Sequence, residues 1–216
     1  YARGILEPTQ DQQDVIFEEI KGRIAKDDST VPYELDGYWY YSRYEEGKEY
    51  AIHCRRRGRE DAPEKVILDE NQEAVDHGFY SVAGLAVSSD GAILAYSEDT
   101  LSRRIYTLRF RSIDTGETYP EAIEGTAGAV VWAMDNHTVF YVKRDPETLR
   151  AHQVWRHELG TEPREDVMVY EETDDTFYVM ASRSKSKKYI VIHSESTLVS
   201  EARFLSSDDP TGEFTV

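Results

Sequence analysis

The chain has 216 residues, and 42 acidic against 25 basic residues give it a formal net charge of −17. This excess argues against nucleic-acid binding and against docking on an anionic membrane surface, because both depend on Lys and Arg side chains. No apolar stretch approaches the roughly 20 residues that span a bilayer. The single cysteine, Cys54, cannot form an internal disulfide, which predicts a reducing compartment.

Residues 1–30 are predicted to form a helical segment that is separate from the strands that follow. Thr9 and Gln12 have the spacing of a capping box, and Ile16, Ile20 and Ile24 recur every four residues. A single helix from about residue 9 to residue 26 is therefore expected. An extended region is expected to follow, because Pro32 disfavours a helical conformation in the residue before it.

From residue 31 onward the sequence predicts strands and turns, with one hairpin design recurring. Residues 85–96 and 130–141 each contain an apolar strand, an Asp-Gly or Asp-Asn turn and a second apolar strand, and the turn residues Asp90 and Asp135 lie 45 positions apart. A third and a shorter fourth strand follow each hairpin, at 105–113 and 117–123 in one copy and at 153–159 and 166–170 in the next. Further copies are predicted at 177–181, 189–193 and 202–205, and less regularly at 38–44, 50–55 and 65–68.

A four-stranded antiparallel unit that repeats every 45 to 50 residues is typical of a β-propeller blade. One such sheet cannot bury both faces alone, so blades pack against each other around an axis. We predict an all-β fold of about four blades, near 31–75, 79–124, 129–172 and 176–216, after the N-terminal helix. A β-sandwich also uses short strands, but it does not require one hairpin to recur at this spacing. Unpaired blade faces are expected to allow self-association.

The sequence predicts no catalytic, metal or cofactor site. Its glycine spacing excludes a Gly-x-Ser-x-Gly nucleophile elbow, a Walker A loop and a Gly-x-Gly-x-x-Gly loop, and no His-Glu-x-x-His motif occurs. His152 and His157 lie five apart on a predicted strand, on opposite faces, which does not suit a shared metal. The basic run at 55–57 and Arg59 is expected to be solvated and paired with local acids.

Longer strings of the sequence resemble the oligopeptidase B (protease II) group of the prolyl oligopeptidase family of serine peptidases. The resemblance covers nearly the whole chain, and strings of this length are far more specific than a short motif. It is carried by Tyr38 to Tyr50, Phe79 to Ser88, Ser97 to Arg104 and Gln153 to Thr161, the last reading Gln-Val-Trp-Arg-His-Glu-Leu-Gly-Thr.

The resemblance implies a cytoplasmic oligopeptidase in which an unclosed seven-bladed propeller covers an α/β-hydrolase domain. That hydrolase domain carries a Ser-Asp-His triad and cuts short peptides after Arg or Lys. The triad lies beyond the part of the family that this chain matches, so no catalytic residue is expected here. The propeller is expected to filter substrates by size and to gate access by moving between open and closed forms. Basic short peptides and the C-terminal hydrolase domain are the expected partners.

In the same family, salt bridges between the propeller and the hydrolase accompany opening and closing. By position, the resemblance maps the propeller side of these salt bridges onto Glu124, Arg150 and Glu171. An ordinary exposed charge is the alternative for each, since exposed salt bridges contribute little. A freestanding propeller scaffold that binds other proteins without catalysis is the alternative for the whole chain.

Overall fold

The computed structural model describes residues 1–216, and the chain divides into two compact units, Tyr1–Asn71 and Gln72–Val216. The first unit contains the N-terminal helices and one four-stranded sheet. The second contains a seven-stranded and a three-stranded sheet, and neighbouring strands in all three sheets pair antiparallel in chain order. The predicted all-β class with a helix at the N-terminus is confirmed.

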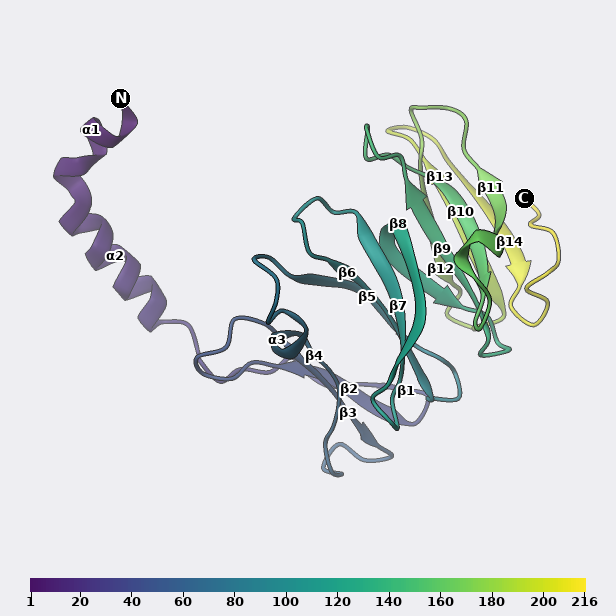
Figure 1. Ribbon diagram of the computed structural model, residues 1–216, viewed down its shortest axis with the longest axis horizontal. Helices are drawn as coiled ribbons and strands as arrows, with labels where there is room; N and C mark the ends of the chain where they lie inside the picture. Colours follow the sequence, from purple (N-terminus) through teal and green to yellow (C-terminus); the bar gives the residue numbers. More distant parts are fainter. The chain divides into compact units, whose positions relative to one another are not determined.

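The helical segment consists of α1 (Ala2–Leu6), the 3-10 helix η1 (Glu7–Thr9) and α2 (Gln10–Gly22), drawn in purple in Figure 1. The helix thus ends at Gly22 and not at residue 26, because glycine disfavours helix and the amides of Arg23 and Ile24 close a short turn onto Ile20 and Lys21. The capping-box prediction is wrong, since the Thr9 hydroxyl donates to the Leu6 carbonyl at 2.7 Å.

No residue of α2 is buried. Its apolar side chains Ile16, Phe17 and Ile20 are 47%, 61% and 57% exposed. The periodic apolar face that predicts this helix is therefore not covered by other residues of the chain.

The sheet of the first unit contains β1 (Tyr33–Leu35), β2 (Tyr38–Arg43), β3 (Ile52–Arg57) and β4 (Lys65–Asp69), and the short helix α3 (Glu70–Glu73) follows β4. Its small core joins Tyr41, Ile52 and Cys54. Burial raises the pKa of the Cys54 thiol to about 12.

Charged side chains of β2 and β3 are held by specific contacts. Arg43 bonds to Glu64 at 3.0 Å, and this hydrogen bond is the main reason that the pKa of Glu64 is lowered. The expectation of a solvated basic run is wrong for two of its members. Arg55 is only 4% exposed and lies over the Tyr38 ring, while Arg56 lies over the Tyr41 ring.

The second unit contains ten strands, and its core joins buried side chains of the second strands in consecutive repeats, such as Ala95 and Tyr141. The seven-stranded sheet consists of β5 (Ser81–Val87), β6 (Ile93–Asp99), β7 (Tyr106–Ser112), β8 (Thr118–Trp132), β9 (Thr138–Arg144), β10 (Ala151–Glu158) and β11 (Val167–Glu171), with the 3-10 helix η2 (Pro163–Glu165) before β11. The three-stranded sheet consists of β12 (Tyr178–Arg183), β13 (Tyr189–Glu195) and β14 (Ser200–Ser206).

The long strand β8 joins two predicted strands into one. Its first half pairs with β7, through Leu108 and Ile123, and its second half pairs with β9, through Val130 and Tyr141. The strand therefore ends one four-stranded repeat and begins the next without a loop. In Figure 1 it runs in teal beside β7.

β5 and the second half of β8 approach each other closely at two glycines. A Cβ atom on Gly84 would lie 1.8 Å from the carbonyl oxygen of Gly128, and both residues have positive φ angles, of 63° and 102°. These two strands open consecutive repeats. Only residues without side chains allow their backbones this approach.

None of the helices combines the length and the apolar composition that a membrane crossing requires.

Candidate functional site

The strands of the second unit end in two groups of loops. The pairs Ser81 with Asp99 and Gln153 with Glu171 lie near one end of the strands, and the pair Val87 with Leu94 lies near the other. We call the end with loops 100–105, 145–150 and 172–177 the first end. The end with turns 88–92, 133–137 and 184–188 is the second end.

The three charged residues singled out in the sequence lie toward the first end. Glu124 stands two residues before Thr126, which pairs with Lys143 near the end of β9, and Arg150 directly precedes β10. Glu171 is the last residue of β11. No hydrogen bond or ion pair joins any two of the three. What they share is a position near the same end of the strands.

Glu124 is exposed on β8 and has no hydrogen bond or ion pair with another side chain of the chain. Glu171 is exposed as well, and its carboxylate accepts one hydrogen bond, from Gln153 Nε2 at 2.8 Å. Both carboxylates can therefore pair with a cation of another domain or molecule at low desolvation cost.

Arg150 is half-buried, and its guanidinium group already has three acceptors. It donates to the carbonyl oxygens of Asp174 at 2.9 Å, Phe177 at 3.1 Å and Glu172 at 3.2 Å. These residues form the connection between β11 and β12. Arg150 thus ties the start of β10 to the loop that leads into the next repeat.

The loop after β11 concentrates negative charge. Burial opposes ionisation of Glu172, but hydrogen bonds from Ser194 and Tyr170 outweigh it, and the pKa of Glu172 is lowered. The pKa of Asp174 is lowered by hydrogen bonds from Thr176. These carboxylates therefore stay ionised at neutral pH. No three His, Cys, Asp or Glu side chains of the chain come together as a metal site.

Sequence reasoning missed a buried cluster between β9, β10 and β11. His157 Nδ1 lies 2.6 Å from Asp166 Oδ1, Tyr141 Oη donates to Asp166 Oδ2 at 2.7 Å, and Phe110 stacks on the imidazole with ring centroids 5.5 Å apart. The side chains of His157 and Asp166 are both 0% exposed. A substrate cannot reach them, so this cluster supports the packing of the core. The two residues lie nine positions apart, where the chain turns back from β10 into β11, and no motif in the sequence marks them as a pair.

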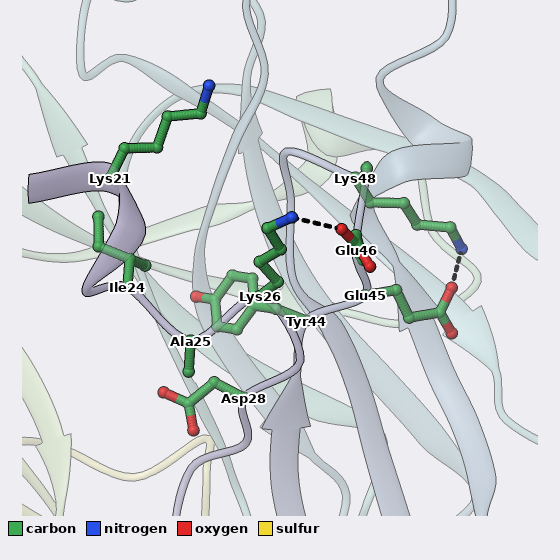
Figure 2. Close-up of a pocket in the computed structure, with 10 residues that line it drawn as sticks. Lys21, Ile24, Ala25, Lys26, Asp28, Tyr44, Glu45, Glu46 and Lys48 are labelled. Atoms are coloured by element: carbon green, nitrogen blue, oxygen red, sulfur yellow. Dashed lines mark hydrogen bonds and ion pairs between the residues drawn. The ribbon is translucent and has the colours of Figure 1, made fainter. Parts of the chain in front are cut away.

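The first unit holds a shallow cavity of about 620 Å³ beside the end of α2. Ile24, Ala25 and Tyr44 supply its apolar wall, and Figure 2 shows the ion pair between Lys26 and Glu46 on its rim, at 2.6 Å. The lining contains no histidine, cysteine or serine. The cavity can accommodate a ligand group, but its lining lacks the serine, cysteine and histidine side chains of a serine or cysteine peptidase site.

Comparison with known proteins gives one consistent family. The family model "Prolyl oligopeptidase, N-terminal beta-propeller domain" matches residues 1–216. Among curated proteins, dipeptidyl aminopeptidase BI of Pseudoxanthomonas mexicana is 39% identical over 100% of this chain and 32% of its own length. Protease 2 of Moraxella lacunata is 32% identical over 97% of this chain and 31% of its own length. The chain thus spans about a third of the length of these relatives.

Solved structures agree with the sequence matches. Oligopeptidase B from Leishmania major superposes with a TM-score of 0.89 and 30% identity, over 98% of this chain and 31% of that one. Oligopeptidase B from Trypanosoma brucei, in a closed form with covalently bound antipain, gives a TM-score of 0.88 and 31% identity, over 99% of this chain and 30% of that one. These matches confirm the β-propeller fold and the resemblance to oligopeptidase B that the sequence predicted.

Proposed function

Because this chain belongs to the prolyl oligopeptidase family, we propose that it is the N-terminal propeller portion of a serine oligopeptidase that hydrolyses short peptides after Arg or Lys. The observation that supports this proposal most directly is the match of the propeller family model to residues 1–216. The curated relatives are about three times as long as this chain. The catalytic triad would then belong to a hydrolase domain of the same protein. The cytoplasm is the proposed compartment.

In this proposal the chain supplies the helical segment 1–30 and about four of seven blades, near 31–75, 79–124, 129–172 and 176–216. The blades would admit short peptides and exclude folded proteins. The exposed apolar side chains Ile16, Phe17 and Ile20 support a second role for the helical segment, as part of the contact with the hydrolase domain. Burying these side chains would stabilise the contact by the hydrophobic effect.

Glu124, Arg150 and Glu171 are the proposed interdomain salt-bridge residues, and the first end is the proposed hydrolase side. Glu124 is the strongest of the three, because it is exposed and has no partner within the chain. Arg150 would act mainly by holding the 172–177 loop in place, since three carbonyl oxygens of that loop accept hydrogen bonds from it.

The charge of the propeller also suits basic substrates. An excess of 17 negative charges attracts Arg- and Lys-containing peptides and raises their encounter rate, and salt screens this attraction. In the full-length enzyme, kcat/KM for a dibasic peptide should fall as the salt concentration rises. An unchanged kcat/KM would contradict this part of the proposal.

The similarity to dipeptidyl aminopeptidase BI favours a second candidate function, in which the full-length protein releases dipeptides from the amino end of its substrates. The products of one peptide with an internal arginine separate the two candidates. Cleavage after the arginine of an amino-blocked peptide supports the oligopeptidase, whereas release of dipeptides from only the unblocked peptide supports the aminopeptidase. A full-length protein that hydrolyses neither peptide would favour the freestanding scaffold.

Substitution of Glu124 tests the docking role. In the full-length enzyme, Glu124→Gln should change kcat/KM for a peptide substrate about threefold, because the open and closed forms would change in population. Glu165→Gln is the matched control, since Glu165 is an exposed glutamate at the second end. Equal effects of the two substitutions would overturn the assignment of Glu124.

A further inference from the structure

A basic turn at the second end has no role in the function proposed above. Residues 182–188 read Ser-Arg-Ser-Lys-Ser-Lys-Lys and contain four cationic residues and no acidic residue, in a chain whose net charge is −17. The turn connects β12 and β13, and Lys185 and Lys188 are exposed. Neither lysine forms an ion pair with an acid of the chain. Positive charge is thus concentrated in one turn of a chain that is acidic overall.

Contacts of Arg183 place this turn near the axis of the propeller. Its Nη1 donates to Ser89 Oγ at 2.9 Å and lies 3.9 Å from Met134 Sδ. Ser89 and Met134 follow β5 and β8, the opening strands of two repeats, and Arg183 is the last residue of β12, which opens the next repeat. Blades radiate from an axis, so a side chain can reach two blades away only where the innermost strands converge. Arg183 therefore lies at the axial opening of the second end.

The guanidinium group of Arg183 lacks a carboxylate partner there. Its contacts are a hydroxyl and a thioether, which leave the cation uncompensated in a half-buried position. Arginine is suited to binding a carboxylate through two parallel hydrogen bonds. The neighbouring lysines add a long-range attraction for the same anion.

We infer that Arg183, supported by Lys185 and Lys188, binds the C-terminal carboxylate of a peptide that lies along the propeller axis. The inference rests on the proposed function, because it takes the hydrolase to cover the first end. β12 runs from the first end to Arg183 over Tyr178–Arg183, and six extended residues span roughly 20 Å. A peptide tail of about six residues would therefore bring its carboxylate to this turn, which would make the turn a sensor of peptide length.

The test uses the full-length protein and an amino-acetylated hexapeptide with uncharged side chains and either a free C-terminal carboxylate or a C-terminal amide. Binding is followed by amide chemical shifts in NMR titrations. The free acid should shift the signals of Ser89, Met134 and residues 183–188 and should bind at least tenfold more tightly than the amide. Equal binding of acid and amide, or no binding of the acid, would overturn the inference. Acetate that binds as tightly as the acid would also overturn it, by indicating a simple anion site.

Three variants identify the residues. Arg183→Gln should weaken binding of the free acid at least tenfold, and Lys185→Gln, which disturbs no contact between turns, should weaken it two- to threefold. Arg103→Gln is the matched control, since Arg103 is an exposed cation in the 100–105 loop at the first end, and it should change binding less than 1.5-fold. An equal effect of Arg103→Gln would refute the site. Because the test measures binding and not cleavage, its outcome does not depend on whether the full-length protein cleaves after Arg or Lys.

Discussion

The close approach of Gly84 and Gly128 predicts a large and specific effect of one methyl group. In Gly84→Ala the new Cβ atom would lie 1.8 Å from the Gly128 carbonyl oxygen and 2.8 Å from its carbon, far inside van der Waals contact. The obstacle is backbone, which cannot rotate away as a side chain can. β5 and β8 would have to separate where consecutive repeats meet.

Two contributions set the magnitude. Placing alanine at a φ of 63° costs about 1 to 2 kcal/mol. Overpacking adds about 1 to 3 kcal/mol more. We therefore expect Gly84→Ala to lower the free energy of unfolding by about 2 to 5 kcal/mol, which corresponds to roughly 4 to 20 °C in Tm for a unit of this size.

Gly125→Ala separates these contributions. Gly125 has a φ of 78°, but no atom lies within 4 Å of its Cβ position, so only the backbone cost of about 1 to 2 kcal/mol applies. Urea unfolding of both variants, followed by circular dichroism, gives the comparison. If Gly84→Ala unfolds within 0.5 kcal/mol of Gly125→Ala, on the order of the error of such measurements, the steric reasoning is refuted.

Three further predictions follow from buried and charged groups. Asp166→Ala should lower the free energy of unfolding by about 3 to 5 kcal/mol, because it leaves His157 buried without its partner; a loss below about 1 kcal/mol in urea unfolding would contradict the importance of this pair. The Cys54 thiol is 1% exposed and its pKa is raised to about 12, so a thiol reagent at pH 8 should label it only after unfolding in urea, and rapid labelling of the folded chain would show that Cys54 is accessible. The lowered pKa of Glu64 contributes stability that is present above about pH 4.5 and is lost as the pH falls through the folded pKa. Glu64→Gln should therefore lower stability at pH 7, by up to about 1 kcal/mol, and the difference should disappear as the pH falls through the folded pKa of Glu64; a difference that persists in acid would reject Arg43 as its cause.

Local patterns predicted the repeated hairpins well. The Asp-Gly turn at 90–91 and the Asp-Asn turn at 135–136 both use a residue with positive φ, Gly91 at 77° and Asn136 at 57°, and the strands on either side follow their apolar pattern. The missed continuity of β8 has a different origin. Its halves pair with different neighbours, β7 and β9, and no local property of residues 124–129 shows that the strand continues through them.

The candidate site was predictable only in part. The resemblance supplied Glu124, Arg150 and Glu171, but the carbonyl acceptors of Arg150 lie 22 to 27 residues away and depend on the fold. The contact of Arg183 with Ser89 was missed for the same reason, because it joins residues of different repeats that meet only when the repeats pack. The pairing of His157 with Asp166 is local, nine positions apart where β10 turns back into β11, and it was missed because no motif marks it.

The sequence by itself determined the strands, the repeat of about 45 residues, the strong negative charge and the family. These follow from short-range effects, because strand alternation and turn residues act within a few positions and composition acts without any geometry. The tertiary structure alone decided which residues of different repeats meet: Gly84 with Gly128, and Arg183 with Ser89. Such contacts depend on backbone paths around the propeller axis, and the axis exists only once the repeats have packed against one another.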